Sequence, residues 1–163
     1  MSFVDCVRVF LLATWLGAAL LFSAVVAPNV FSVLHSFQLA NANHIAGTIV
    51  TRTLSVVNVG GFIIGLLSLA AMMTPKQTAS RAWLGGSFAL LTIATAVGHW
   101  VIAARMLALR TSMMMPIDQV MTNDPRRVAF NNLHHYSVIA LGVAMLAALA
   151  AIIAIMRADG TKR

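Results

Sequence analysis

The residues of this sequence with the greatest capacity for chemistry are its histidines. All five are predicted to lie toward the same face of a membrane: His35, His44, His99, His134 and His135. A neutral imidazole is the commonest side-chain ligand of transition metals, and it exchanges protons near neutral pH. We therefore predict a metal site in which His99 and His134 or His135 bind haem b iron or copper. The predicted cofactor contacts, for example to a quinone headgroup, are His99, His134 and Asn58.

Each histidine also has a simpler interpretation. Histidines near helix ends contact lipid headgroups, and a histidine inside a span hydrogen-bonds a neighbour such as Asn58 or a backbone carbonyl. His134 and His135 are about 100° apart around a helix, so they do not face the same site. The local pattern leaves open which of them faces the bundle interior. The methionines 113–115 add thioethers, which favour Cu(I), but they equally suit an interfacial anchor.

Four apolar runs must position these side chains. The runs cover about 9–27, 54–73, 83–104 and 133–156, and none contains Asp, Glu, Lys or Arg. At roughly 1.5 Å per residue, each crosses a hydrocarbon core of about 30 Å. The chain is 60% hydrophobic and only 9% charged. We predict an all-α integral membrane four-helix bundle in a single domain, 1–163.

The connections between the runs also carry signals. Loop 1 (28–52) has helical spacing of apolar residues, which predicts a short interfacial helix, and the second helix is expected to begin near His44. Loop 2 (74–81) reads as a short hairpin. In loop 3 (105–127), Pro116 and Pro125 interrupt any long helix. Asn123 or Asp124 is a candidate cap for a fourth helix that begins near Pro125.

The net charge of +7 comes from basic residues at the ends of the spans. They form no basic stripe with interleaved aromatics, so nucleic acid is not an expected partner. Arg8 precedes the first span, and no Lys or Arg follows until Arg52. This asymmetry predicts cytoplasmic termini, with loops 1 and 3 on the opposite side of a bacterial inner membrane.

Several short motifs resemble those of the transmembrane-protein-205-like family of small four-span membrane proteins. The first is an aromatic-x-Gly followed by a Pro-x-x-Phe-x-x-Leu turn, at Trp15, Gly17, Pro28, Phe31 and Leu34. "HIAGTIV" (44–50) is similar to the stretch that leads into that family's second helix. A Phe-x-x-Leu-His-x-x-Ser signature matches Phe130, Leu133, His134 and Ser137. The resemblance implies a four-helix membrane fold and favours His134 over His135. It implies little about activity, although eukaryotic members are associated with platinum-drug resistance.

No Ser/His/Asp order, phosphate loop or zinc-binding helix motif occurs, and no carboxylate lies within a span. The sequence therefore favours a non-enzymatic accessory or structural subunit of a membrane complex. Its expected partners are the lipid bilayer and either another membrane protein or a second copy of the chain. Gly61-x-x-x-Gly65 permits close helix approach, either within the bundle or in a homodimer. The alternatives are a haem- or copper-binding protein for electron transfer or metal handling, and a quinone-reactive oxidoreductase component.

Overall fold

The structure is a computed structural model that describes residues 2–72 and 79–160. Over these residues the chain forms four long helices and no strand. The first helix runs through α1 (Phe3–Leu21), the π-helical η1 (Phe22–Val26) and α2 (Ala27–Ser36), and the second is α3 (Ala42–Ala70). The third comprises α4 (Ala79–Ala96), the π-helical η2 (Val97–Ala103) and α5 (Ala104–Ser112). The fourth is α6 (Pro125–Gly160), and a 3₁₀ turn, η3 (Ile117–Gln119), lies between α5 and α6.

All four helices are long and apolar enough to cross a membrane. The continuous stretches are Phe3–Ser36, Ala42–Ala70, Arg81–Ser112 and Pro125–Ala158. Each coincides with one of the predicted spans, so the predicted all-α four-helix membrane fold is confirmed. The protein is an integral membrane protein. The hairpin predicted for 74–81 lies largely outside the described residues.

The helix expected in loop 1 is present as α2, but it is not separate from the first span. Pro28 lacks an N–H donor, and in a regular α-helix its ring would collide with the carbonyl of residue 24. The π-helical η1 includes residue 24 and ends two residues before Pro28, and the helix continues through it to Ser36. Loop 1 is thereby reduced to residues 37–41, and the second helix begins at Ala42, close to the expected His44.

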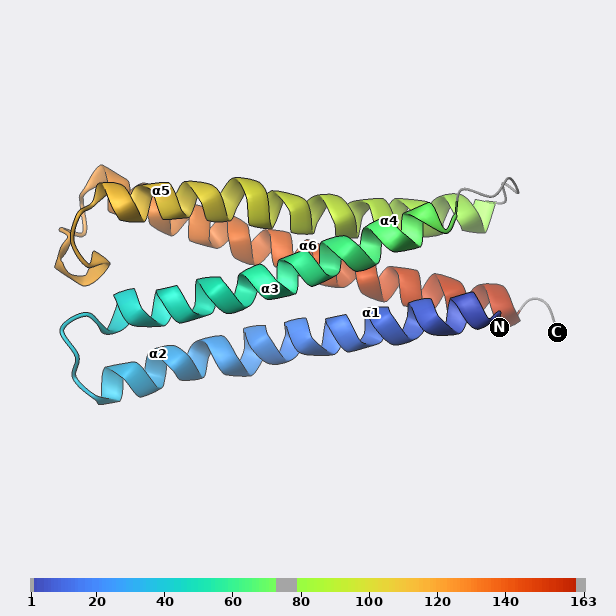
Figure 1. Ribbon diagram of the computed structural model, residues 1–163, viewed down its shortest axis with the longest axis horizontal. Helices are drawn as coiled ribbons and strands as arrows, with labels where there is room; N and C mark the ends of the chain where they lie inside the picture. Colours follow the sequence, from blue (N-terminus) through green and yellow to red (C-terminus); the bar gives the residue numbers. More distant parts are fainter. Residues whose placement is uncertain (1, 73–78, 161–163) are drawn as a thin grey trace.

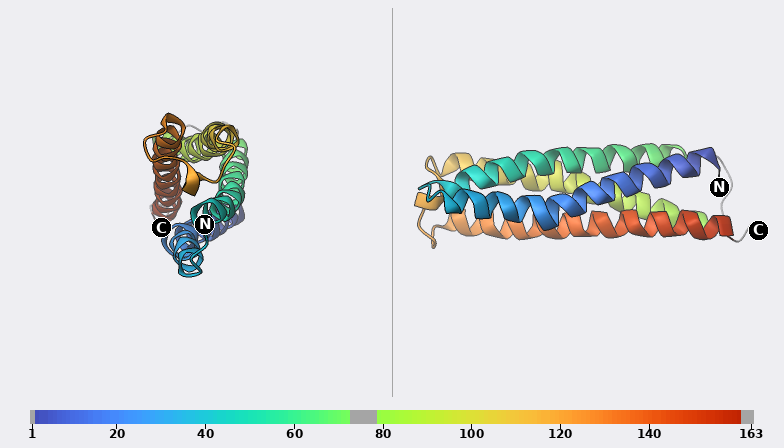
Figure 2. Two further views of the ribbon diagram at one scale, coloured as in Figure 1. Left: turned by 90° about the vertical axis from the view of Figure 1, so that its left-hand side faces the viewer. Right: turned by 90° about the horizontal axis from the view of Figure 1, so that it is seen from below.

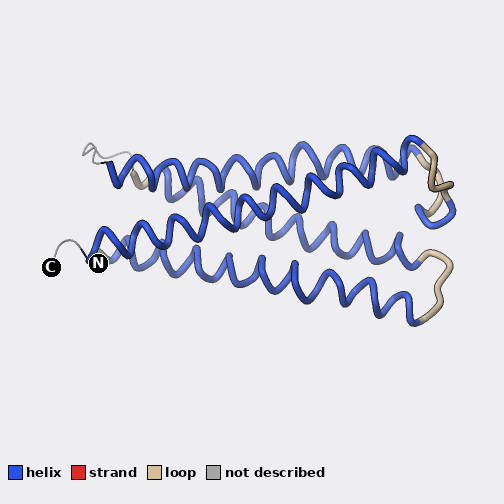
Figure 3. The backbone as a smooth tube through the Cα atoms, turned by 180° about the vertical axis from the view of Figure 1, so that it is seen from behind, coloured by secondary structure: helices blue, strands red, loops and turns tan. Residues whose placement is uncertain are grey.

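Successive helices are antiparallel, so α1 begins and α6 ends at the same end of the bundle (Figures 1 and 3). The connections 37–41 and 113–124 lie at the other end, which we call the loop end. Viewed along the bundle, α1 packs against α3 and α6, and α4 packs against the same two helices (Figure 2). Each helix therefore has two neighbours, as in an up-down four-helix bundle.

Small residues bring the second helix close to its neighbours. A Cβ at Gly65 would lie 2.3 Å from Thr92 Oγ1 and 3.3 Å from the Thr92 backbone nitrogen. A Cβ at Gly61 would lie 2.8 Å from both the Trp15 ring and Thr95 Cγ2. The Gly-x-x-x-Gly pair is thus used inside the bundle, where the bare backbone of the second helix is approached closely by residues of its neighbours.

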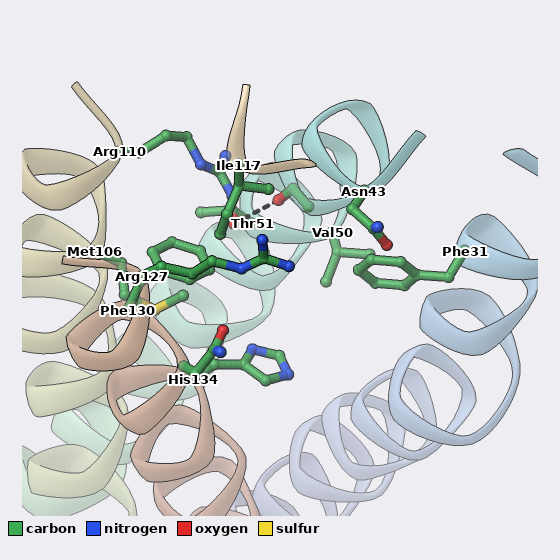
Figure 4. A pocket seen from close by; sticks show the side chains of 12 residues that line it. Phe31, Asn43, Val50, Thr51, Met106, Arg110, Ile117, Arg127, Phe130 and His134 are labelled. Atoms are coloured by element: carbon green, nitrogen blue, oxygen red, sulfur yellow. Dashed lines mark hydrogen bonds between the residues drawn. The ribbon is translucent and has the colours of Figure 1, made fainter. Parts of the chain in front are cut away.

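The bundle opens toward the loop end. The first and fourth helices contact each other along α1, but α2 leans onto α3 and diverges from α6 (Figures 1 and 4). Loop 3 folds back over the opening and buries a second apolar cluster formed by Ile102, Met106, Met113, Ile117, Val120 and Phe130. A cavity remains between these parts.

Candidate site: a cationic cavity at the loop end

The cavity has a volume of about 310 Å³ and lies between α2 and α6 (Figure 4). Every helical stretch of the loop end contributes to its wall. The lining residues are Phe31, Asn43, Gly47, Val50, Thr51, Met106, Arg110, Ile117, Arg127, Phe130, Asn131 and His134. Two arginines, two asparagines, a threonine and a histidine therefore line a space whose other side chains are apolar.

Arg110, on α5, is held against the second helix. Its Nη1 donates to Thr48 Oγ1 at 3.1 Å, and its guanidinium carbon lies 5.3 Å from the centroid of the Phe130 ring. Its Nη2 is 2.8 Å from the position a Cβ would take at Gly47. The absence of a side chain at Gly47 thus makes room for the guanidinium beside α3.

Arg127, in the first turn of α6, projects its guanidinium across the cavity toward Phe31 and His134 (Figure 4). One of its nitrogens, Nη1, donates to the carbonyl of Val120 in loop 3. That bond ties Arg127 to loop 3, and the guanidinium extends into the cavity (Figure 4).

The cavity holds positive charge without a matching carboxylate. No Asp or Glu lines it. Two carboxylates elsewhere in the chain are already paired with arginines outside the cavity wall, Asp5 with Arg8 and Asp124 with Arg126. Within residues 2–72 and 79–160, the buried Nε of Arg110 has no hydrogen-bond acceptor. Both cavity arginines therefore retain donor capacity.

A hydrogen-bond network behind the cavity joins three segments. Asp118 of loop 3 accepts from Asn43 Nδ2 at 2.6 Å and from the His44 backbone N–H at 3.0 Å. Because the Asn43 amide nitrogen is donating, its Oδ1 is the acceptor for His35 Nε2 at 3.0 Å. Asp118 thereby satisfies one of the backbone N–H groups that lack an acceptor in the first turn of α3, and it holds loop 3 there.

Two of the three predicted cofactor contacts, His99 and Asn58, lie outside the cavity wall. His99, on η2, is half-buried; its Nδ1 is 3.2 Å from Ser55 Oγ, and its ring makes an edge contact with Trp100. Asn58 is 4% exposed, and a Cβ at Gly98 would lie 3.1 Å from its Nδ2. The hydrogen-bond partner of His99 is thus Ser55, one helical turn from Asn58.

The adjacent histidines separate as helical geometry requires. His134 lines the cavity, whereas His135 points along its own helix with Nδ1 2.9 Å from the Asn131 carbonyl. In the described part of the chain, no three His, Cys, Asp or Glu side chains gather as a metal site would need. The thioethers also diverge, since Met113 is 2% exposed and Met114 is 93% exposed. The haem and copper assignments stay predictions.

The family model described as "Domain of unknown function (DUF4149)" matches residues 10–114, well over half of the chain. This chain belongs to the DUF4149 family. The DUF4149 match covers most of the first helix, the second and the third, including Gly47 and Arg110, and it ends before Arg127 and His134 on α6. No curated protein and no solved structure matches the chain.

Sequence reasoning about this DUF4149 member missed both cavity arginines. Their positions at the ends of the spans indicate only flanking charges that set orientation. One signal was available: the segment from Arg105 to Arg127 has four arginines but only two acids, Asp118 and Asp124. The partners of these acids depend on how loop 3 folds, which periodicity does not give.

Proposed function

We propose that this DUF4149 protein is a non-enzymatic accessory subunit that packs against another membrane protein. The supporting observation is an outward-facing groove of about 360 Å³ between α4 and α6, on the half of the bundle away from loop 3. Its lining residues are Ala82, Trp83, Gly86, Ser87, Leu90, Leu146, Ala147 and Ala150.

The groove has the composition that membrane helices use to associate. Ala82 and Gly86 are four residues apart and both exposed, which is the small-x-x-x-small arrangement. A Cβ at Gly86 would meet nothing within 4 Å, in contrast to Gly61 and Gly65, which the bundle itself uses. Large apolar side chains flank the groove, with Leu146 68% exposed. A partner helix that enters it gains close backbone contact at Gly86.

Photo-crosslinking in the native membrane tests this proposal. A photoreactive residue at Leu146 is expected to give one discrete adduct, and Gly86→Leu, which fills the groove, is expected to abolish it. Gly17→Leu is the matched control, because Gly17 is also an exposed helical glycine with nothing within 4 Å. An adduct of twice the chain mass identifies a second copy as the partner. Lipid adducts alone would refute the proposal.

We propose further that the protein resides in a bacterial inner membrane with its termini in the cytoplasm. The support is Arg8 before the first span. Cys6, the only cysteine, is exposed near the start of α1 and reports the orientation directly. A membrane-impermeant maleimide added to intact spheroplasts should leave Cys6 unlabelled and should label Met114→Cys in a Cys6→Ser background. The reverse pattern would invert the topology.

A histidine-bound haem or copper, or a bound quinone, is the alternative function. The observation in its favour is His99, which is half-buried within a span on a π-helical segment of a kind frequent at functional sites. An absorption spectrum and metal analysis of the purified protein decide between the alternatives. A Soret band or stoichiometric copper that disappears in His99→Ala would establish the cofactor. The absence of both signals would exclude haem and copper.

A further inference from the structure

The loop-end cavity has the donor set of an anion site. Arg110 and Arg127 both line it, and Asn43 and Asn131 line it as well. A guanidinium presents several N–H donors in a plane that matches phosphate or carboxylate oxygens. Two partly buried cations are mutually repulsive unless an anion lies between or near them. Since none of the carboxylates that the structure describes lines the cavity, an anion that bridges the two arginines would come from outside the chain.

The arginines are held in place before any ligand arrives. Arg110 is fixed by Thr48, by the Phe130 ring and by the space over Gly47. Arg127 is fixed by the Val120 carbonyl. Binding therefore loses little side-chain freedom, which is the condition for a built site rather than a mobile surface charge.

Much of the remaining wall is apolar. Phe31, Val50, Met106 and Phe130 line the cavity beside the charged groups. The cavity also lies near the loop-side ends of four helices that are each longer than a hydrocarbon core of about 30 Å requires. A ligand suited to it carries an anionic head at the arginines and an apolar portion against the rings.

We infer that this cavity binds a phosphate group through Arg110 and Arg127. A phosphate ester at this depth comes either from the headgroup of an anionic phospholipid or from a soluble phosphate. Basic pockets between spanning helices bind anionic headgroups in the same manner. The inference is independent of the α4–α6 groove, which lies on the other half of the bundle.

Lipid titration of the purified full-length protein, followed by native mass spectrometry, measures the site. Phosphatidylglycerol is compared with phosphatidylcholine, and inorganic phosphate is titrated separately with thermal unfolding as the readout. We expect phosphatidylglycerol to bind more tightly than phosphatidylcholine. The double variant Arg110→Gln/Arg127→Gln should weaken phosphatidylglycerol binding about tenfold or more, because each arginine forms a charged hydrogen bond. Arg105→Gln, an exposed arginine on the same helix, should not.

A second pair of variants keeps both arginines. Asn131→Asp places a carboxylate on the cavity wall, where it competes with the ligand for the guanidinium groups. Asn132→Asp adds the same charge at the adjacent exposed position, which does not line the cavity. Asn131→Asp should abolish the lipid preference and Asn132→Asp should preserve it.

Each outcome has a definite meaning. Phosphatidylglycerol preference that depends on both arginines identifies a lipid headgroup as the source. Stabilisation by inorganic phosphate with the same arginine dependence, without lipid preference, identifies a soluble phosphate. Binding that is equal for both lipids and insensitive to phosphate overturns the inference. So does a loss in Arg105→Gln or Asn132→Asp as large as in the cavity variants.

Discussion

The indole ring of Trp15 occupies the space that a side chain at Gly61 would need. Its Nε1–H donates to the Val57 carbonyl at 2.7 Å, and its six-membered ring lies against the Gly61 backbone. One helical turn further on, Gly65 admits Thr92 of α4 in the same way. The second helix is thereby bound to the first and third through its own backbone.

Substitution of these glycines is expected to destabilise the bundle. In Gly61→Ala or Gly65→Ala, the added methyl overlaps Trp15 or Thr92, and overpacking of this kind costs about 1–3 kcal/mol. The free energy of unfolding in detergent measures the effect. Gly17→Ala is the control and should be neutral or stabilising by up to about 1 kcal/mol, because the methyl meets nothing and alanine favours helix. Equal losses at Gly17 and Gly61 would show that packing is not the cause.

Trp15→Phe should have a smaller effect. In a regular helix the Val57 carbonyl already accepts the Gly61 N–H, so the indole supplies its second bond. Interhelical hydrogen bonds in membranes contribute about 0.6 kcal/mol on average. We expect a loss near that size in the same unfolding assay, and no loss for Trp83→Phe, whose ring is 67% exposed. A loss of several kcal/mol would indicate that the ring repacks.

Asp118→Ala should release loop 3 from the start of α3. The carboxylate accepts from Asn43 and from the His44 backbone N–H, and charged hydrogen bonds are the stronger kind. Hydrogen exchange at the His44 amide is expected to accelerate about tenfold. The control Gln119→Ala changes an exposed neighbour. Unchanged exchange in Asp118→Ala would mean that apolar burial alone holds the loop.

The ionised carboxylate of Asp124 stabilises the start of the fourth helix, and acid is expected to remove this stabilisation. Its carboxylate accepts from the Arg126 side chain and backbone N–H, and these bonds lower its pKa from 3.8 to about 2. Because the pKa is lower in the folded state, the stabilisation is complete above pH 3.8 and disappears as the pH falls toward 2.

Asp124→Asn removes this titration but retains a capping acceptor. The variant should be less sensitive than wild type to acid between pH 3.8 and about 2 when unfolding is followed by circular dichroism. Asp124→Ala should be equally insensitive to acid but less stable at neutral pH. Identical acid profiles for wild type and Asp124→Asn would contradict the assignment.

Hydropathy and helix-boundary signals predicted much of the fold. Charge-free runs located the four spans, and Asp124–Pro125 marked the start of the fourth helix, as the Asp124 cap confirms. The first helix was expected to end near Pro28, but it continues to Ser36, and a π-helical turn that ends two residues before the proline accommodates it. Local sequence rules predict that a helix ends at a proline. They do not show when the preceding turn becomes π-helical and lets the helix continue.

The candidate site was less predictable. The His134 side chain lines a cavity, but its neighbours there are arginines and asparagines rather than His99. This arrangement depends on the divergence of α2 from α6 and on the fold of loop 3. Both result from contacts between distant residues, such as Asn43 with Asp118, which no pattern along a single segment records.

The two π-helical segments also set the rotational register of the cavity walls. Phe31 follows η1 and Arg110 follows η2, each on the loop-end part of its helix. One residue corresponds to about 100° of rotation around an α-helix. Removing a single residue from η1 to restore regular helix would turn Phe31 by that angle, away from the cavity. The same deletion in η2 would turn Arg110 away from Thr48 and Gly47. The cavity would then be lost although all of its lining residues remain in the chain.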